Sequence, residues 1–133
     1  MKRVTKCGYT IDEAEDLARV TTILQTVGDN MTQESASEGL VSILQGFQLD
    51  PSTALRVVDS INEVANRMPI DTSGITEGLK RSAASFFTAN TDLNKSIALI
   101  TTSNAVVQDP SSVGTMFKTS SVFMYRNVHI AQI

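Results

Sequence analysis

Apolar residues recur every three or four positions along almost the whole chain, the spacing of one face of an α-helix. Each apolar stripe predicts a helix with one buried face. Alternation of apolar and polar residues with a period of two, which would indicate strands, never persists. The pattern therefore predicts an all-α fold of about six helices, over residues 17–27, 36–47, 54–65, 75–86, 93–107 and 113–117.

Polar residues just before these stripes predict where the helices begin. Thr10 and Glu13 have the spacing of a capping box. Asp50-Pro51 and Asp109-Pro110 each place an acceptor before a proline, whose missing amide costs nothing in the first helical turn. The caps expected for the remaining helices are Thr32, Ser73 and either Thr91 or Asp92.

The chain also resembles itself. Residues 19–31 resemble residues 56–68, 37 positions later, and each copy is followed by a polar turn and then by Glu-Gly-Leu, at 38–40 and 77–79. A weaker third copy at 102–108 resembles residues 60–66 at an offset of 42. A single helical hairpin cannot cover its own apolar face, so neighbouring units must stack. The sequence predicts three helix-turn-helix repeats that form a layered bundle or a short solenoid.

Gly39 and Gly78 stand at equivalent places in the first two copies, and Gly114 stands roughly there in the third. A glycine inside a helix costs about 1 kcal/mol relative to alanine. Its recurrence favours a close approach between helices, which would offset that cost. Chance is the alternative, because the chain has seven glycines.

The apolar stripes also give the residues expected to carry packing and self-association. They are Leu40, Leu44, Phe47, Val57, Ile61, Val64, Leu79, Phe86, Ile97 and Ile100.

Composition agrees with one globular domain, since 41% of the residues are hydrophobic and 19% are charged. Aromatic residues make up only 5%, which suits thin helical layers. A net charge of -3 argues against specific nucleic acid binding, and Lys80-Arg81 is too small a basic patch to reverse that. We expect no transmembrane segment, because no apolar run approaches the roughly 20 residues that span a bilayer. A signal peptide is not expected either.

Candidate chemistry is sparse. Cys7 and His129 are the single cysteine and the single histidine, so we expect no disulfide, no zinc site and no catalytic pair within the chain. Asp12, Glu13, Glu15 and Asp16 fall in the first turns of a predicted helix, where its dipole favours negative charge. We therefore expect no catalytic residue, no metal and no cofactor, and a protein that is not an enzyme.

Several runs, in this order, resemble the core region of phage tail tape-measure proteins. They are EGLVSILQGFQL (38–49), VVDSINEVAN (57–66), SGITEGLKRSAAS (73–85), SIALITTSN (96–104), and the closing VQDP (107–110) with VGT (113–115). The resemblance covers about residues 7–119, nearly the whole chain.

The resemblance implies a long, largely helical structural protein that lies inside the tail tube and sets tail length during assembly. Its implied partners are the tail tube protein and tail assembly chaperones. We also expect a homo-oligomer, because a segment of a longer repeat protein can associate through its exposed repeat interfaces. The implied location is the virion tail, and the host cytoplasm during assembly. On this basis the chain divides into a lead-in (1–9), a helical-repeat tape-measure core (10–119) and a divergent tail (120–133).

The chain departs from the family pattern in length and in its ending. Fully helical, it would reach only about 200 Å, so a fragment, a cloned domain or a degraded prophage gene is expected. Residues 120–130 do not continue the family pattern, and residues 120–133 are expected to be poorly ordered.

Two other functions remain open. One is an intracellular helical-repeat module that binds a peptide or a partner helix. The other is a small lytic enzyme, for which Glu13, Glu38, Glu63 and Glu77 are the candidate acids.

Overall fold

The computed structural model describes residues 8–131, with side chains as far as Ser120. Every regular element in that part of the chain is helical, which confirms the all-α prediction and its six helices. They are α2 (Ile11–Val27), α3 (Gln33–Gly46), α4 (Ala54–Ala65), α5 (Thr72–Thr88), α6 (Leu93–Val107) and α7 (Pro110–Ala131), with one 3₁₀ turn, η1 (Pro51–Thr53), before α4.

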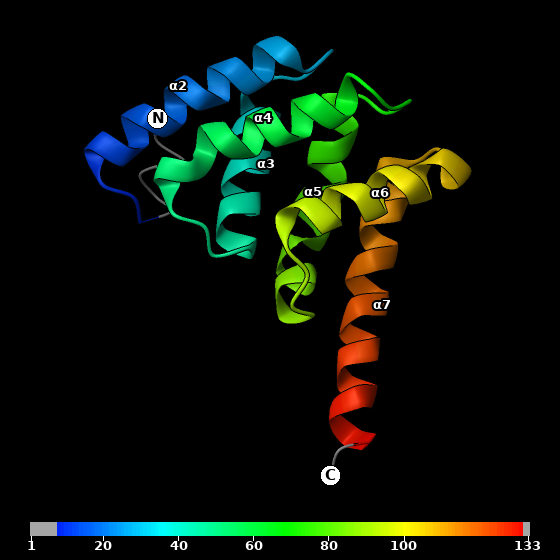
Figure 1. The fold of residues 1–133 in the computed structure, drawn as a ribbon. Coiled ribbons are helices and arrows are strands. Elements are labelled where there is room, and N and C mark those ends of the chain that lie inside the picture. The colour runs from blue at the N-terminus through cyan, green and yellow to red at the C-terminus, as the bar shows by residue number, and fades with distance from the viewer. Residues whose placement is uncertain (1–7, 132–133) are drawn as a thin grey trace.

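The six helices form two layers (Figure 1). The first helices of the three hairpins, α2, α4 and α6, follow one another along one layer, and α4 contacts both of the others. The second helices, α3, α5 and α7, lie side by side in the other layer, with α5 packed against both α3 and α7. Consecutive hairpins therefore stack as repeats, in the order of the chain.

Capping residues begin the helices largely where the sequence predicts. Thr10 and Glu13 form the expected capping box, with the Thr10 amide donating to Glu13 Oε2 over 2.8 Å. Thr32 caps α3, and Asp92, rather than Thr91, caps α6. The prediction of Ser73 as the cap is wrong, because the N-cap of α5 is Asp71, two residues earlier, whose carboxylate accepts from the Gly74 amide.

Two aspartate–proline pairs start elements in different ways. Asp50 accepts from the Ser52 amide over 2.9 Å, and the short 3₁₀ turn η1 leads into α4. Asp109 precedes Pro110, the first residue of α7, and accepts a hydrogen bond from the Ser112 hydroxyl. Both prolines stand where the sequence predicts the start of a helical segment.

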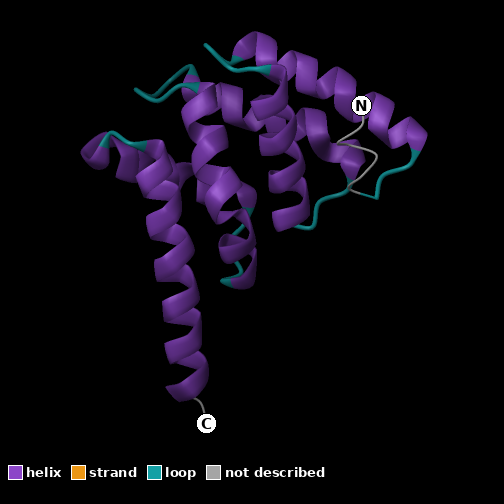
Figure 2. Ribbon diagram, turned by 180° about the vertical axis from the view of Figure 1, so that it is seen from behind, coloured by secondary structure: helices purple, strands orange, loops and turns teal. Residues whose placement is uncertain are grey.

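The longest helix, α7, carries the backbone past the end of its neighbour α5, as both ribbon views show (Figures 1 and 2). The predicted boundary at residue 119 falls inside this helix. The division of the chain at that residue stays a prediction.

Candidate functional site

The residues expected to carry packing come together in one hydrophobic core. Leu40, Leu44, Ile61, Leu79 and Ile100 are fully buried there, and Phe47, Val57, Phe86 and Ile97 are at most 6% exposed. Val64 is half-buried and packs against the same core. These side chains contact other parts of their own chain, so a surface for a second copy has to be found among exposed residues. Their role in self-association stays a prediction.

Glycine sets the spacing between α3 and α5. A Cβ added to Gly39 would lie 2.5 Å from Cγ2 of Thr76, and one added to Gly46 would lie 2.5 Å from Cβ of Ala83. Real Cβ atoms essentially never come that close, so a side chain at either position would force its neighbour to shift: the Thr76 side chain at Gly39, and the backbone of α5 at Gly46. The close approach predicted at Gly39 is therefore present.

The second contact, at Gly46, was not predicted from the sequence. Gly39 and Gly46 are seven residues apart, about two turns of helix, so both fall on the same face of α3. The spacing of seven between the two glycines is the sequence signal that predicts the contact at Gly46. Thr76 and Ala83 of α5 share the same spacing of seven, which matches the two contacts along the helix pair.

Glycine also sets the spacing between α5 and α7. A Cβ added to Gly114 would lie 2.6 Å from the carbonyl oxygen of Gly78. One added to Gly78 would lie 3.0 Å from Cγ2 of Ile100, on α6. Further along the same pair, the rings of Phe86 and Phe117 are tilted by 39° with centroids 5.2 Å apart. Backbone contact and an aromatic pair together hold α7 against α5.

Ion pairs on the surface also involve α3 and α5. Lys80 Nζ of α5 lies 3.4 Å from Glu38 Oε2 of α3, and this pair bridges two repeats. Arg81 and Glu77 pair within α5 over 2.8 Å. All of these side chains are at least a third exposed, so each pair contributes at most about 1 kcal/mol.

The four glutamates considered for a lytic enzyme each have a local partner. Glu13 accepts from the Thr10 amide in the capping box, and Glu63 pairs with Arg67 over 3.1 Å. Glu38 and Glu77 belong to the pairs with Lys80 and Arg81. These contacts give each carboxylate a structural role in helix capping, helix pairing or surface charge balance.

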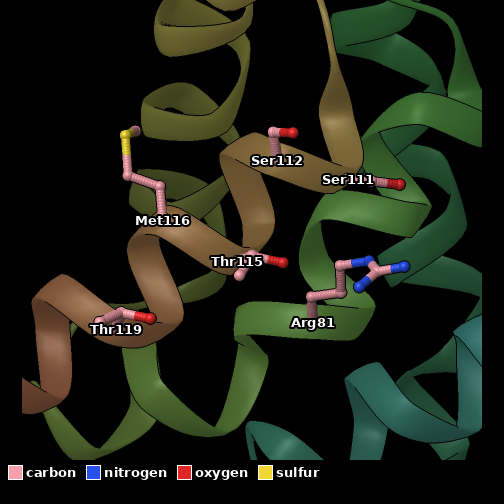
Figure 3. Close-up of a pocket in the computed structure, with 6 residues that line it drawn as sticks. All are labelled: Arg81, Ser111, Ser112, Thr115, Met116 and Thr119. Carbon is pink, nitrogen blue, oxygen red and sulfur yellow. The ribbon is translucent and has the colours of Figure 1, made fainter.

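An open hollow of about 460 Å³ lies beside the first turns of α7 (Figure 3). It is lined by Arg81, Ser111, Ser112, Thr115, Met116 and Thr119, and more of its surface is apolar than polar. The guanidinium is engaged by Glu77, and Ser112 donates to Asp109. Such a lining can offer hydrogen bonds to a partner surface.

The hydrogen bond from Ser112 lowers the pKa of the Asp109 carboxyl below its ordinary value, more than the slight burial of that group raises it. The pKa of Asp50 is lowered in the same way by its hydrogen bonds from Ser52. Both carboxylates cap helical segments, and hydrogen bonds to the charged form explain both shifts.

Among the described residues, no group of three or more histidine, cysteine, aspartate or glutamate side chains could hold a metal ion. No helix in the same part of the chain has the length and apolar character needed to cross a bilayer. Cys7 and the side chain of His129 lie outside what the structure describes.

Comparison with known proteins identifies a family. A family model described as phage-related minor tail protein matches residues 1–124. Searches of curated proteins and of solved structures returned no match. The family match includes all six helix starts and every glycine contact between the stacked helices. This chain belongs to the family of phage-related minor tail proteins.

Proposed function

We propose that the chain is a helical-repeat segment of a tail tape-measure protein and takes part in tail assembly and in setting tail length. The observation that carries the proposal is the glycine-spaced stack of α3, α5 and α7, in a chain of the minor tail family. A stack of equivalent units has a length that follows the number of units, which is what a length standard needs. The role is structural and requires no catalysis.

The contacts with the tail would come from exposed residues rather than from the core. The hollow beside α7 and the exposed faces of the first helices can meet the inner wall of the tail tube or a neighbouring copy. The buried apolar residues keep the distance between units constant, because closely packed interiors resist compression.

The first experiment locates the protein. Tails released after phage or prophage induction are purified and digested with trypsin, and peptides 57–67 and 82–95 are sought by mass spectrometry. We expect both peptides to copurify with tails in a constant ratio to the tube protein. Their confinement to the soluble cell fraction, with intact tails present, would overturn the proposal in favour of an intracellular binding module or a decayed gene.

The second experiment tests length determination directly. Residues 51–90, which hold the second hairpin, are deleted or duplicated in the phage gene, and tail lengths are measured by electron microscopy. An extended helix would change the tail by about 60 Å, at 1.5 Å per residue for 40 residues. A stacked unit would change it by about 10 Å, the distance between packed helices. Intact tails of unchanged length in both variants would contradict the role in length determination.

A further inference from the structure

Two side-chain oxygens on the inner face of α6 are buried without a hydrogen-bond partner in the part of the chain that the structure describes. They are Thr101 Oγ1 and Asn104 Oδ1, in residues that are 4% and 7% exposed. Leaving a buried polar group without a partner is unfavourable, and nearly all such groups in folded proteins bond to the protein or to ordered water. The two oxygens therefore point to a bound molecule that donates hydrogen bonds.

The spacing of the two residues fits a single small molecule between them. Thr101 and Asn104 are three positions apart on one helix, so their side chains are neighbours on the same face, with Cβ atoms about 5–6 Å apart. Two hydrogen bonds of about 2.8 Å through one shared oxygen span a comparable distance. The amide oxygen of Asn104 can only accept, whereas the Thr101 hydroxyl can accept and donate. A water molecule can satisfy both groups at once.

The equivalent positions of α4 are apolar. All four buried residues of α4 match buried residues of α6 at an offset of 43, which pairs Ile61 with Asn104. The same offset pairs Val58 with Thr101. Asparagine is smaller than isoleucine by more than the roughly 30 Å³ that one water occupies in the liquid. Relative to α4, α6 therefore has less side-chain volume at this place, by the amount that a water fills, and gains the polar atoms to hold it.

The first helix, α2, provides an internal comparison. Thr21 corresponds to Val58 at the offset of 37, is 2% exposed, and has a hydroxyl oxygen that also lacks a partner among the described residues. Three positions later, however, stands the fully buried Leu24, which has no polar atom to share a ligand. Buried waters typically make about three hydrogen bonds, so the isolated hydroxyl of α2 is a weaker site than the pair on α6.

We propose that Thr101 and Asn104 hold a buried water molecule on the inner face of α6, where this helix packs against α5 and α7 (Figure 1). The water donates one hydrogen bond to Asn104 Oδ1 and forms a second one with the Thr101 hydroxyl. The site belongs to the folded chain itself and is independent of the role in the tail proposed above.

The first test is a crystal structure of the full chain at a resolution that shows ordered water in its core. We expect one solvent oxygen at about 3 Å from both Thr101 Oγ1 and Asn104 Oδ1. The wild-type density decides the question without any substitution. A map with no solvent oxygen in contact with both atoms overturns the proposal.

The second test counts long-lived waters in solution by oxygen-17 magnetic relaxation dispersion. Thr101→Val/Asn104→Leu gives α6 side chains of the kind that α4 and α2 carry, and it is expected to lower the count by one relative to wild type. Thr21→Val is the matched control, because it removes a buried hydroxyl without a polar neighbour, and it is expected to leave the count unchanged.

Helical circular dichroism checks that each variant folds. Thr101→Val/Asn104→Ala repeats the test without adding volume, in case leucine does not fit at position 104. The cavity that alanine leaves is lined by apolar groups and is expected to stay dry. A count that both double variants leave at the wild-type value would overturn the proposal, as would an equal decrease in the Thr21→Val control.

Discussion

Gly114 of α7 contacts the backbone of Gly78 of α5 so closely that a Cβ at position 114 would lie 2.6 Å from the Gly78 carbonyl oxygen. The two helices thus meet backbone to backbone at this point. The glycine in each helix lowers helix propensity, but it permits a distance between the two helices that no other residue permits.

Gly114→Ala is expected to destabilise the fold by about 1–2 kcal/mol. Overpacking lowers the free energy of unfolding by about 1–3 kcal/mol, whereas the higher helix propensity of alanine raises it by up to about 1 kcal/mol. The midpoint of urea unfolding measures the change. Thr115→Ala, at the exposed neighbouring position, is the control and is expected to stay within about 0.5 kcal/mol of wild type. An increase in stability for Gly114→Ala would mean that the close contact is absent.

Ile61→Asp is expected to unfold the domain, because it places a charge without a partner at a fully buried position of α4. The expected loss is at least about 3–5 kcal/mol, a large part of the stability of a small domain. Helical circular dichroism and the melting temperature give the measurement. Leu55→Asp, on the exposed side of the same helix, should keep both near wild type. Wild-type values for Ile61→Asp would show that this face of α4 does not form the core.

The lowered pKa of Asp109 predicts a pH dependence. Because the pKa is lower in the folded than in the unfolded state, the charged carboxylate stabilises the fold above its ordinary pKa of about 4. That contribution disappears as the pH falls through the folded pKa. Asp109→Asn should therefore melt at a lower temperature than wild type at pH 7, and the difference should close at an acid pH below the folded pKa. A difference that is equal at both pH values would contradict a role for the charge.

Gln108→Gly is expected to stabilise the protein. Gln108 ends α6 with φ of 58°, a left-handed conformation that costs a side chain about 1–2 kcal/mol and glycine almost nothing. The greater freedom of glycine in the unfolded chain destabilises the fold by about 0.5–1 kcal/mol. The free energy of unfolding is therefore expected to rise by about 0.5–1 kcal/mol in total. Differential scanning calorimetry measures it. Ala98→Gly within the same helix should have the opposite sign, which excludes a general effect of glycine.

Much of this fold could be predicted from the sequence, because helix periodicity, caps and the internal repeat are local signals. The spacing of Leu40, Leu44 and Phe47 predicts a buried helix face, whichever other helix packs against that face. The sequence does not determine the cap of α5, because Ser73 and Asp71 are both good capping residues and only the backbone path decides between them.

Contacts between helices were harder to predict. Gly39 recurs in the repeat, which predicts a close contact there. Gly46 has no glycine at the equivalent place in α5, so the repeat does not predict its contact with Ala83. The hollow around Arg81 joins two helices whose register depends on tertiary packing. That register cannot be predicted from the residue pattern of either helix alone.

The position of α5 has a consequence for how the chain opens. Both outer hairpins contact the rest of the second-helix layer through this one helix. Fraying can begin at α2 or α6 and leave the remaining pairs intact, whereas opening of α5 separates both outer hairpins at once. Backbone amides of α5 should therefore exchange with deuterium most slowly, at a rate set by global unfolding. Protection is expected to fall towards α2 on one side and α6 on the other.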